Sequence, residues 1–597
     1  MQPDKLLYSL INSRLAASIF LFLISFLIFI PSLKNDFVWD DIPYILDRIE
    51  YLTISHQVNK ALPKTLSEDK KRAYYRPALH ISLAADNEIW KGKAFGFHLT
   101  NVVMHSVSTV LLFLLILLIS KELSLCHGRE IAIVSSLLYA LHPIHVETVS
   151  FIMARSDLLC AMFVYCFFIF YIKSYEKVFY LVPSLFFFCF ALLSKEVAFV
   201  FPVLVVVYDL LRPKQPLSKY IARYSVCMIL FLVYIYFRSK AFVVVPEFSY
   251  SVIDPGSTGI SKAAVIVQNF LNAYGFYVYK LFFPFDFNVS AGRLPVNFSF
   301  IVLCFSLIIS LGLFLYRKYR FNSFAVILII LTLAPAVFVS VLDVVSSPYA
   351  ERFLYIPSAG FCMVLGYLFV TSKWRFKLPK YSVWTAIVLV CLLYGVFTVK
   401  EQFVWKNNYT LWKKAVQRSP EHPMPRLNYG YSLIKRGDID GAITEFTKAA
   451  EYEKDYNKSQ KALAYNNLGT AYLNKGDFKK AEDSFRMAFK SDPKYKSTYH
   501  YHLGLIYYLK GEKIYLQNRP QAQKFYAKAL KYLKKANRKA RSHRRLHLIL
   551  AEVYLRQSNF KAAHKYAEAS LKPGKFNLDA RLRDRAKYIL ELSKRYM

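Results

Sequence analysis

The sequence has few cysteines, and they form no recognisable binding or cross-linking pattern. Eight occur in 597 residues, and most lie inside apolar runs. No CxxC pair is present, so the cysteines indicate neither a zinc site nor a disulfide framework. The first apolar run also lacks a small-residue cleavage site and ends in a charged loop. We therefore expect it to remain as a membrane span rather than to be removed as a signal peptide.

Acidic residues are scarce as well. There are 40 Asp and Glu against 78 Lys and Arg, which gives a formal net charge of +38. In a soluble protein this balance would favour nucleic-acid binding, but no DNA or RNA recognition motif is present. Much of the basic excess lies in short loops between apolar runs, where multispanning proteins carry it on the cytoplasmic side. The charge therefore predicts membrane orientation rather than a nucleic-acid partner.

Long apolar runs are absent after residue 405 but frequent before it. Runs such as SIFLFLISFLIFI and VVMHSVSTVLLFLLILLI are long enough to cross a bilayer. We predict an all-α protein, with a polytopic membrane helix bundle in residues 1–400, a bridging segment in 401–422 and a repeat domain in 423–597. Twelve segments are candidate spans: 15–33, 97–119, 131–141, 158–172, 178–193, 197–211, 221–237, 263–283, 298–316, 324–341, 353–370 and 383–399.

Basic loops predict the orientation of these spans. Residues 212–219, 317–320 and 373–380 should be cytoplasmic, whereas twelve full crossings from a cytoplasmic N-terminus would put the last two outside. Segment 263–283 is the best candidate for one that does not cross fully, because its polar side chains suit a re-entrant helix or a wet cavity. They are Gln268, Asn269, Asn272 and Lys280. We expect eleven crossings and an extracytoplasmic repeat domain.

Two adjacent carboxylates follow the first span, in the stretch KNDFVWDD. Asp40 and Asp41 would stand at the membrane–water boundary on the outer side. Adjacent acids repel each other, so one is expected to have a raised pKa and to suit proton abstraction. The alternative is a solvated loop with a helix cap, since Asp often precedes a helix.

The other outer loops add more ionisable side chains. They are Tyr75 and Arg76 in YYRP; His142, His145, Glu147, Arg155 and Asp157 in HPIHVETVSFIMARSD; Lys195 and Glu196 in SKE; and Glu351 and Arg352 in AERFLY. Each motif has a plain alternative, such as snorkelling cations, a solvated turn or interfacial histidines. A zinc site is disfavoured, because a proline separates the histidines and no HExxH follows. Their gathering at one face suits a catalytic site for a lipid-borne phosphate.

Residues 423–597 contain a repeat. Small and aromatic residues recur in one order, with a period of about 34 residues that is typical of tetratricopeptide repeats. The four units are Gly430, Leu433, Ala442, Phe446 and Ala449; Gly469, Tyr472, Ala481, Phe485, Ala488 and Pro493; Gly504, Tyr507, Ala522, Tyr526 and Ala529; and Ala551, Tyr554, Ala562, Tyr566 and Ala569. Such arrays stack into superhelices that bind peptides or proteins, with a structural cap as the alternative.

The chain resembles the transmembrane and tetratricopeptide-repeat-containing O-mannosyltransferases, members of the GT-C class of membrane glycosyltransferases. The resemblance depends on an ordered set of motifs: the Asp pair, YRP, HPIHVE with ARSD, SKE, AERFLY and the repeats. The resemblance covers nearly the whole chain, although animal members usually have more than four repeats. It implies inverting transfer from a polyprenyl-phosphate sugar, such as dolichyl-phosphate mannose, to a hydroxyl acceptor, with a protein Ser or Thr as the expected acceptor. In related GT-C enzymes an acidic residue of the first outer loop acts as the base. The resemblance therefore implies that role for Asp40 or Asp41, with Asp40 narrowly preferred.

The residues suit this chemistry. Displacement at the anomeric carbon needs a base and cations for the departing phosphate, and Arg76, Lys195 and Arg352 are candidates for the latter. His142, His145 and Glu147 could position the base or bind sugar hydroxyls, and Arg155 and Asp157 could pair with each other. Tyr75, Glu196 and Glu351 complete the positioning set. We expect no metal and no cofactor beyond the lipid-linked sugar substrate.

Three alternatives remain open. One is a GT-C enzyme with another sugar, or with a glycan or lipid acceptor. Another is a non-enzymatic membrane scaffold that displays repeats to partners. A transporter is disfavoured, because its charges would lie near mid-membrane. The expected partners are the polyprenyl-phosphate sugar, membrane lipid and an acceptor protein, and no nucleic acid. The expected location is a bacterial inner membrane with periplasmic repeats, or the endoplasmic reticulum membrane with lumenal repeats.

Overall fold

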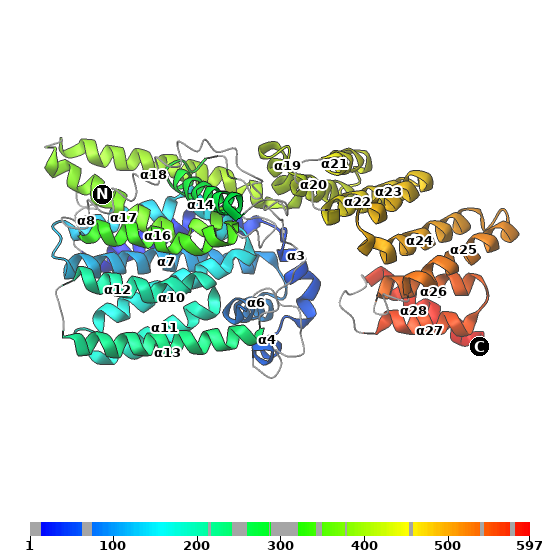
Figure 1. Ribbon diagram of the computed structural model, residues 1–597, viewed down its shortest axis with the longest axis horizontal. Helices are drawn as coiled ribbons and strands as arrows, with labels where there is room; N and C mark the ends of the chain where they lie inside the picture. The colour runs from blue at the N-terminus through cyan, green and yellow to red at the C-terminus, as the bar shows by residue number, and fades with distance from the viewer. Residues whose placement is uncertain are drawn as a thin grey trace. The chain divides into compact units, whose positions relative to one another are not determined.

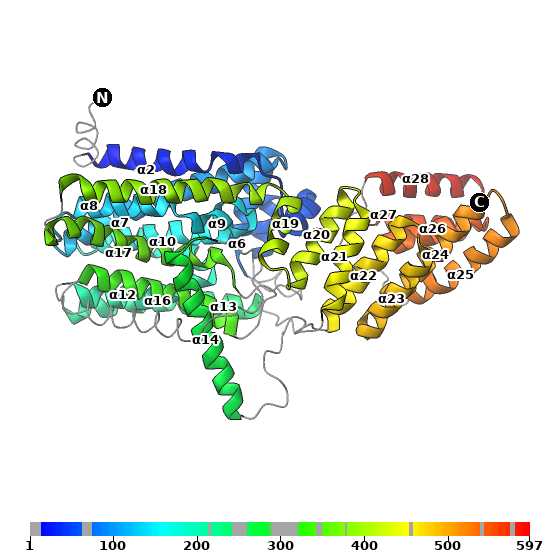
Figure 2. The same ribbon diagram turned by 90° about the horizontal axis from the view of Figure 1, so that it is seen from above.

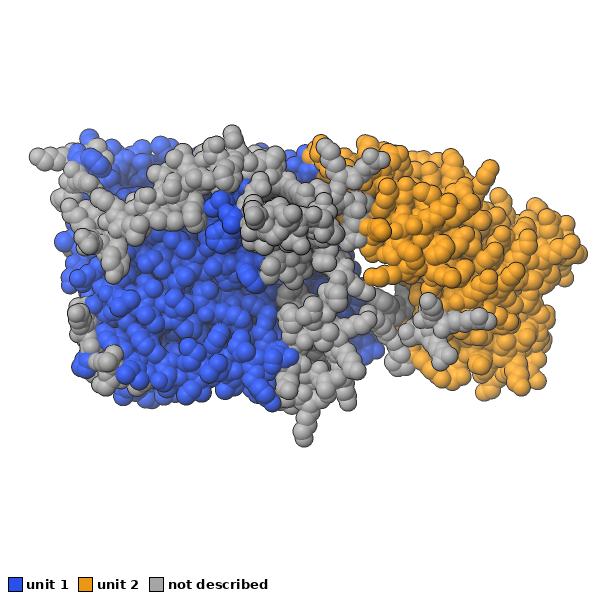
Figure 3. Space-filling model, in the orientation of Figure 1, with its two compact units in different colours: residues 1–419 blue, residues 420–597 orange. Residues whose placement is uncertain are grey.

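The protein is helical and divides into two compact units. The computed structural model describes residues 13–61, 75–212, 216–241, 259–285, 287, 320–341, 349–376, 379–452, 458–537, 543–572 and 580–597. Within these ranges there is no β-strand, so the predicted all-α class is confirmed. The first unit spans residues 1–419 and the second spans residues 420–597 (Figure 3). Most of the predicted bridging segment therefore lies in the first unit.

The first unit is a bundle that contains many long helices (Figure 1). Its α-helices are α2 (Arg14–Ile28), α3 (Asp41–Tyr44), α4 (Ile54–Ala61), α6 (Pro77–Trp90), α7 (Ala94–Glu122), α8 (Gly128–Leu141), α9 (Val146–Ser150), α10 (Arg155–Lys173), α11 (Leu181–Ser194), α12 (Phe201–Leu211), α13 (Leu217–Ala241), α14 (Gly259–Phe282), α16 (Arg320–Val341), α17 (Pro357–Arg375), α18 (Lys380–Gln402) and α19 (Asn408–Arg418). Short 3₁₀ turns include η1 (Ile30–Lys34), η3 (Pro143–His145), η6 (Glu196–Val200) and η8 (Glu351–Leu354).

Several of these helices can cross a membrane. Four of the described helices are long and apolar enough, and α8 with the bent continuation Pro143–Ser150 makes up to five. The four are Ala94–Glu122, Ile152–Lys173, Arg320–Phe338 and Tyr381–Lys406. Shorter apolar helices occupy Arg14–Ile28, Val178–Ser194 and Pro357–Ser372. The chain is therefore a multi-pass membrane protein. Predicted span 298–316 lies outside the described residues, and the number of eleven crossings stays a prediction.

Glycine lets the central helices approach closely. A Cβ atom added at Gly366 of α17 would lie 2.2 Å from Ser135 Oγ of α8. One added at Gly360 would lie 2.4 Å from the Ala325 carbonyl oxygen of α16. Side chains larger than hydrogen cannot be accommodated at either contact without a shift. These positions seat α17 between α8 and α16, and the preceding turn η8 contacts η3 and α9.

Helix α14 runs across the direction of its neighbours in the bundle (Figure 2). That segment 263–283 does not cross the membrane fully stays a prediction. Near its end, Lys280 Nζ lies 3.4 Å from Glu351 Oε1 and donates a hydrogen bond of 2.8 Å to the Phe285 carbonyl oxygen. Helix α14 thus brings a further cation to the turn that carries Arg352.

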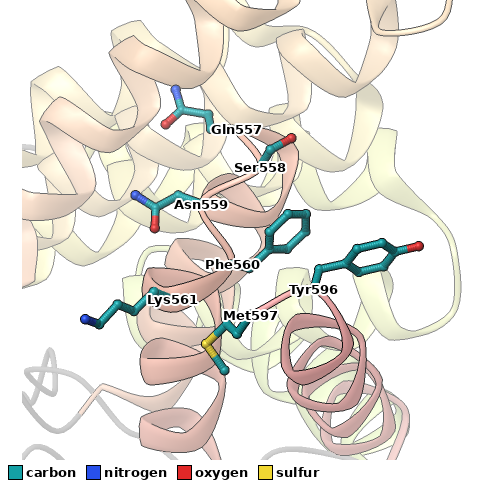
Figure 4. Close-up of a pocket in the computed structure, with 7 residues that line it drawn as sticks. All are labelled: Gln557, Ser558, Asn559, Phe560, Lys561, Tyr596 and Met597. Carbon is teal, nitrogen blue, oxygen red and sulfur yellow. The ribbon is translucent and has the colours of Figure 1, made fainter.

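The second unit is an array of helix pairs. The pairs are α20 (Pro423–Lys435) with α21 (Ile439–Glu451), α22 (Lys458–Lys475) with α23 (Phe478–Ser491), α24 (Lys496–Ile514) with α25 (Arg519–Asn537), and α26 (Arg544–Arg556) with α27 (Phe560–Leu571). A last helix, α28 (Ala580–Arg595), packs on α26 and α27. Where α27 begins and α28 ends, the rings of Phe560 and Tyr596 stack beside a shallow pocket (Figure 4).

The second helix of every pair begins with the same cap. The side chains of Asp438, Asp477, Asn518 and Asn559 each accept a hydrogen bond from the backbone N–H three residues later. Such caps satisfy amide groups that a helix start leaves without partners. The shared caps show that the four units repeat one local structure.

The cap corrects the predicted register of the fourth repeat. The repeat pattern predicts Ala562 and Ala569 as its small packing residues, but the structure buries Ala563 and Ala567 instead. In the first repeat, Ala442 follows the cap residue by four positions, and Ala563 stands in the same relation to its cap. Several alanines in this stretch fit the motif in either register, and only packing distinguishes them.

Candidate active site

Asp41 is built into the fold. It is the first residue of α3, the next helix after η1, and its side chain is fully buried. The Val38 N–H donates to one carboxyl oxygen at 3.1 Å and the Met153 N–H donates to the other at 3.0 Å. Burial raises the pKa of Asp41 to about 8, and the neighbouring Asp40 charge adds to the shift. Asp41 therefore ties the first outer loop to the segment before α10 and is mostly protonated at neutral pH.

Asp40 has a different environment. Its side chain is half-buried, and no hydrogen bond to its carboxylate is formed by the described part of the chain. Burial raises the pKa of Asp40, and the nearby Arg352 guanidinium partly opposes that shift. Of the two adjacent acids, Asp40 is the one whose oxygens remain available to an incoming molecule.

Trp39, which sequence analysis did not single out, holds the Asp pair in place. Its φ angle is 49°, a left-handed conformation that is rare for a bulky residue and costs about 1–3 kcal/mol. Its N–H donates to Asn408 Oδ1 of α19 at 2.9 Å. Its ring stacks on Phe151 at 5.3 Å and meets Trp412 edge-on at 5.6 Å. Helix α19 therefore supports the backbone immediately before Asp40.

Arg352 pairs with Glu147 and lies close enough to Asp40 to lower the pKa of that carboxyl group. Its Nη1 forms an ion pair with Glu147 Oε1, and its backbone N–H donates to Oε2 at 2.9 Å. The guanidinium lies 5.7 Å from the Trp39 ring centroid and 5.2 Å from that of Phe353. Its remaining guanidinium nitrogens have no hydrogen-bond partner among the described residues. Arg352 can thus offer donors to an anion next to Asp40.

Lys195 lies on the same aromatic ring as Arg352. Its ammonium is 4.9 Å from the Phe353 ring centroid and 2.5 Å from Asp157 Oδ1. Both members of this ion pair are buried. Two of the predicted phosphate-binding cations, Lys195 and Arg352, are therefore brought together around Phe353.

The predicted pairing of Arg155 with Asp157 is wrong. Arg155 Nη2 instead lies 2.5 Å from Asp86 Oδ2 of α6, and Arg155 Nε donates to Asn101 Oδ1 at 2.7 Å. Asp157 pairs with Lys195. Residues two apart on a helix point in different directions, so these two side chains of α10 reach different neighbours. Arg155 holds α6 and α7 against α10.

Arg76 forms a third ion network with Glu196. Its Nε and Nη2 donate to both carboxylate oxygens, the shortest contact being 2.6 Å. Arg238 of α13, which sequence analysis missed, donates to Glu196 Oε1 at 2.9 Å. Burial alone would raise the pKa of Glu196, but the two arginines lower it to about 2. Tyr75 is buried beside Tyr234, which contacts Arg238.

The two histidines lie in the interior of the bundle. His145 Nε2 is hydrogen-bonded with Ser358 Oγ at 2.8 Å, and its ring centroid lies 4.4 Å from Tyr139 and 4.8 Å from Tyr355. His142 Nδ1 accepts from the Ile144 N–H at 3.3 Å, which caps η3. These contacts are with backbone, hydroxyl and ring groups rather than with Asp40 or Arg352. The role of His142 and His145 in positioning the base or binding sugar hydroxyls stays a prediction.

Known proteins resemble both the repeat unit and most of the chain as a whole. Tetratricopeptide repeat families match residues 462–495 and 521–577. The human protein O-mannosyl-transferase TMTC3 is 25% identical over 76% of this chain and 53% of its own length. Protein O-mannosyl-transferase F38B6.6 of Caenorhabditis elegans is 23% identical over 72% of this chain and 62% of its own. The human protein O-mannosyl-transferase TMTC1 is 24% identical over 74% of this chain and 55% of its own length.

The chain spans about half the length of the first of these curated relatives. Among solved structures, the APC/C hetero-tetramer Cut9-Hcn1 is similar with 12% identity and a TM-score of 0.26, over 92% of this chain and 96% of that chain. A likeness at that level adds nothing to the description of the fold. The named relatives and the repeat matches together confirm the resemblance drawn from the motifs: the chain matches the transmembrane and tetratricopeptide-repeat-containing O-mannosyltransferase family.

Proposed function

We propose that this chain is a membrane glycosyltransferase that moves one mannose from a polyprenyl-phosphate donor to the hydroxyl of a protein Ser or Thr. The observation that carries the proposal is the juxtaposition of Asp40 with Arg352: among the described residues, the Asp40 carboxylate accepts no hydrogen bond and part of the Arg352 guanidinium donates none. The names of the relatives support the sugar and the acceptor class.

The chemistry is a single displacement. Asp40 accepts the proton of the acceptor hydroxyl as its oxygen attacks the anomeric carbon. The bond between that carbon and the phosphate oxygen breaks, and the polyprenyl phosphate leaves with the electron pair. Arg352 and Lys195, which flank Phe353, stabilise the negative charge that develops on the leaving phosphate. The sugar is transferred with inversion at the anomeric carbon.

The predicted phosphate-binding residues differ in how far their cationic groups are already engaged in ion pairs. Arg76 already donates to both oxygens of Glu196, and Lys195 is paired with Asp157. Arg352 uses one arm of its guanidinium on Glu147 and can turn the other toward an anion. We therefore assign direct phosphate contact to Arg352. Lys195, next to the same Phe353 ring, supports it through its charge, as does Arg76.

We place the reaction on the extracytoplasmic side. Arg212, in one of the predicted cytoplasmic turns, pairs with Glu122 at the C-terminal end of α7 at 2.7 Å, whereas Phe97, near the start of α7, packs edge-on against Phe37 of the loop that carries Asp40. Basic turns favour the cytoplasm, which leaves the Asp40 end outside. In a bacterium this side is the periplasm, and in the endoplasmic reticulum it is the lumen.

Transfer from radiolabelled polyprenyl-phosphate sugars tests the proposal. Purified intact chain should transfer mannose, and polyprenyl-phosphate glucose serves as the comparison donor. Asp40→Asn should lower the rate by about 10²–10⁴-fold, the usual contribution of a positioned base. Arg352→Ala should also lower it strongly. The proposal fails if folded Asp40→Asn protein transfers sugar at the rate of the intact chain, or if the intact chain transfers none, as expected of a scaffold without enzymatic activity.

A further inference from the structure

The third helix pair of the second unit carries a strong excess of positive charge. Between residues 496 and 537 there are nine Lys and Arg and one acid, Glu512. That acid is already engaged, since its carboxylate accepts from Arg556 at 2.6 and 2.8 Å and from the Tyr526 hydroxyl at 2.6 Å. Within the described chain, the lysines of this pair form no ion pairs. The positive charge on α24 and α25 is therefore not neutralised internally.

Aromatic rings hold some of these lysine ammonium groups in position. Tyr507 of α24 stacks nearly parallel on Tyr532 of α25, with centroids 5.6 Å apart. The ammonium groups of Lys510 and Lys528 lie 5.4 and 5.6 Å from the Tyr507 ring centroid, and that of Lys535 lies 5.8 Å from Tyr532. Cation–π contacts of this kind favour particular positions of the ammonium groups. We call these five residues the lysine surface.

We propose that the lysine surface binds an acidic polypeptide segment of a partner protein, whose Asp and Glu carboxylates pair with Lys510, Lys528 and Lys535. The proposal goes beyond sugar transfer, because binding at this surface needs no catalysis. Three neighbouring ammonium groups already held on rings lose little further freedom on pairing. An extended segment with regularly spaced acids can contact all of them together.

The details of the surface favour a polypeptide over other polyanions. Bases of a single-stranded nucleic acid stack on open aromatic faces, whereas Tyr507 and Tyr532 stack on each other and carry lysines. Insertion into a lipid surface needs exposed apolar side chains, and in this helix pair the one large exposed apolar side chain is Leu516, in the turn between the helices. Repeat arrays of this kind generally present surfaces to polypeptides.

Fluorescence anisotropy with the full chain in detergent micelles tests the proposal. The probe is a fluorescein-labelled peptide of repeated Glu-Gly-Ser, and the neutral comparison peptide has Gln in place of Glu. The Glu peptide should bind more weakly as salt is added, because ion pairs at an exposed surface are screened. The Gln peptide should bind at least about tenfold more weakly than the Glu peptide.

Charge-reversal variants locate the binding. The triple variant Lys510→Glu, Lys528→Glu and Lys535→Glu should weaken binding of the Glu peptide by at least about tenfold, and a Lys-Gly-Ser peptide should bind this variant instead. A matched control reverses three lysines that already have carboxylate partners. The control changes are Lys475→Glu, Lys480→Glu and Lys572→Glu. The control should retain binding within about twofold, since it changes net charge equally but leaves the lysine surface intact.

Three results would overturn the inference. One is failure of the intact chain to bind the Glu peptide. Another is equal weakening by both triple variants, which would show a response to net charge alone. The third is tighter, lysine-dependent binding to anionic phospholipid vesicles or to a single-stranded oligonucleotide. Because the readout is binding rather than transfer, an inactive enzyme that still binds the peptide would refute the proposed function and leave this inference standing.

Discussion

Two neighbouring carboxyl groups in one loop have different tasks because their surroundings differ. Asp41 is buried and bound by backbone amides, whereas Asp40 faces Arg352 and remains accessible. The sequence indicates that acidic residues lie here. It does not show which of the two can accept a proton from a substrate, because they are neighbours in the chain. The difference depends on the left-handed turn at Trp39, which no residue type predicts. It becomes visible only when the loop is packed against α10 and α19.

The pH dependence of transfer should report on Asp40. The base must be ionised, so the rate should rise with pH through its raised pKa. Arg352 lowers that pKa, so Arg352→Gln should shift the rising limb of kcat/KM to higher pH, in addition to reducing the rate. Arg352→Lys keeps the charge and should leave the limb near its original position. A limb that does not move in Arg352→Gln would show that another group titrates.

Asp41 should make stability depend on pH. Its pKa is raised from an ordinary value near 3.8 to about 8 in the folded protein, so the folded state binds the proton more tightly. The free energy of unfolding should therefore fall as pH rises between these two values. In Asp41→Asn this contribution to the slope should vanish. That variant should also lose about 1–3 kcal/mol, because one backbone N–H loses its acceptor. Melting temperatures in detergent across this pH range measure both effects.

At the scale of elements, helix α10 presents two polar side chains to two different neighbours. Arg155→Ala should destabilise the protein by about 3–5 kcal/mol, because it leaves Asp86 buried without its partner. The double change Arg155→Ala with Asp86→Ala should recover part of this loss. A melting-temperature cycle should show strong coupling between Arg155 and Asp86 and weak coupling between Arg155 and Asp157. Strong coupling within the second pair would contradict the structure.

Helix α19 should act on catalysis without touching the substrate. Asn408 Oδ1 accepts from the Trp39 N–H at 2.9 Å and from Trp412 Nε1 at 3.3 Å. Asn408→Ala should release the turn before Asp40 and lower kcat by about tenfold with little change in donor KM. Asn428→Ala, which removes an asparagine from α20, is the control. A change confined to donor KM would show that α19 serves binding instead.

The sequence predicts elements better than it predicts their contacts. Apolar runs locate the helices, because length and hydrophobicity suffice to identify them. Side-chain partners depend on how each helix is rotated, which explains the mispaired Arg155 and the shifted alanines of the fourth repeat. Arg238 and Trp39 were missed for a related reason. An arginine at a helix end and a tryptophan in a loop carry no signal of their own until Glu196 and Asn408 are seen beside them.

At the scale of the whole molecule, the two ends of the bundle should face different compartments. Cys126 is exposed in the turn between α7 and α8, at the end opposite to Asp40. A membrane-impermeant maleimide should therefore label it only from the cytoplasmic side. A cysteine introduced as Ser55→Cys, in α4 beyond the Asp pair, should be labelled only from the outer side. Labelling of both positions from one side would refute the proposed sidedness.

The support that α19 gives to Trp39 also decides where the polypeptide can be shortened. Ending the chain at residue 400, where the last apolar run stops, would discard Asn408 and Trp412 together with the Lys406 carbonyl that accepts from the Asp36 N–H. Ending it at residue 419 would keep all three. A minimal transferase should therefore carry residues 401–419 in addition to the apolar helices that precede them.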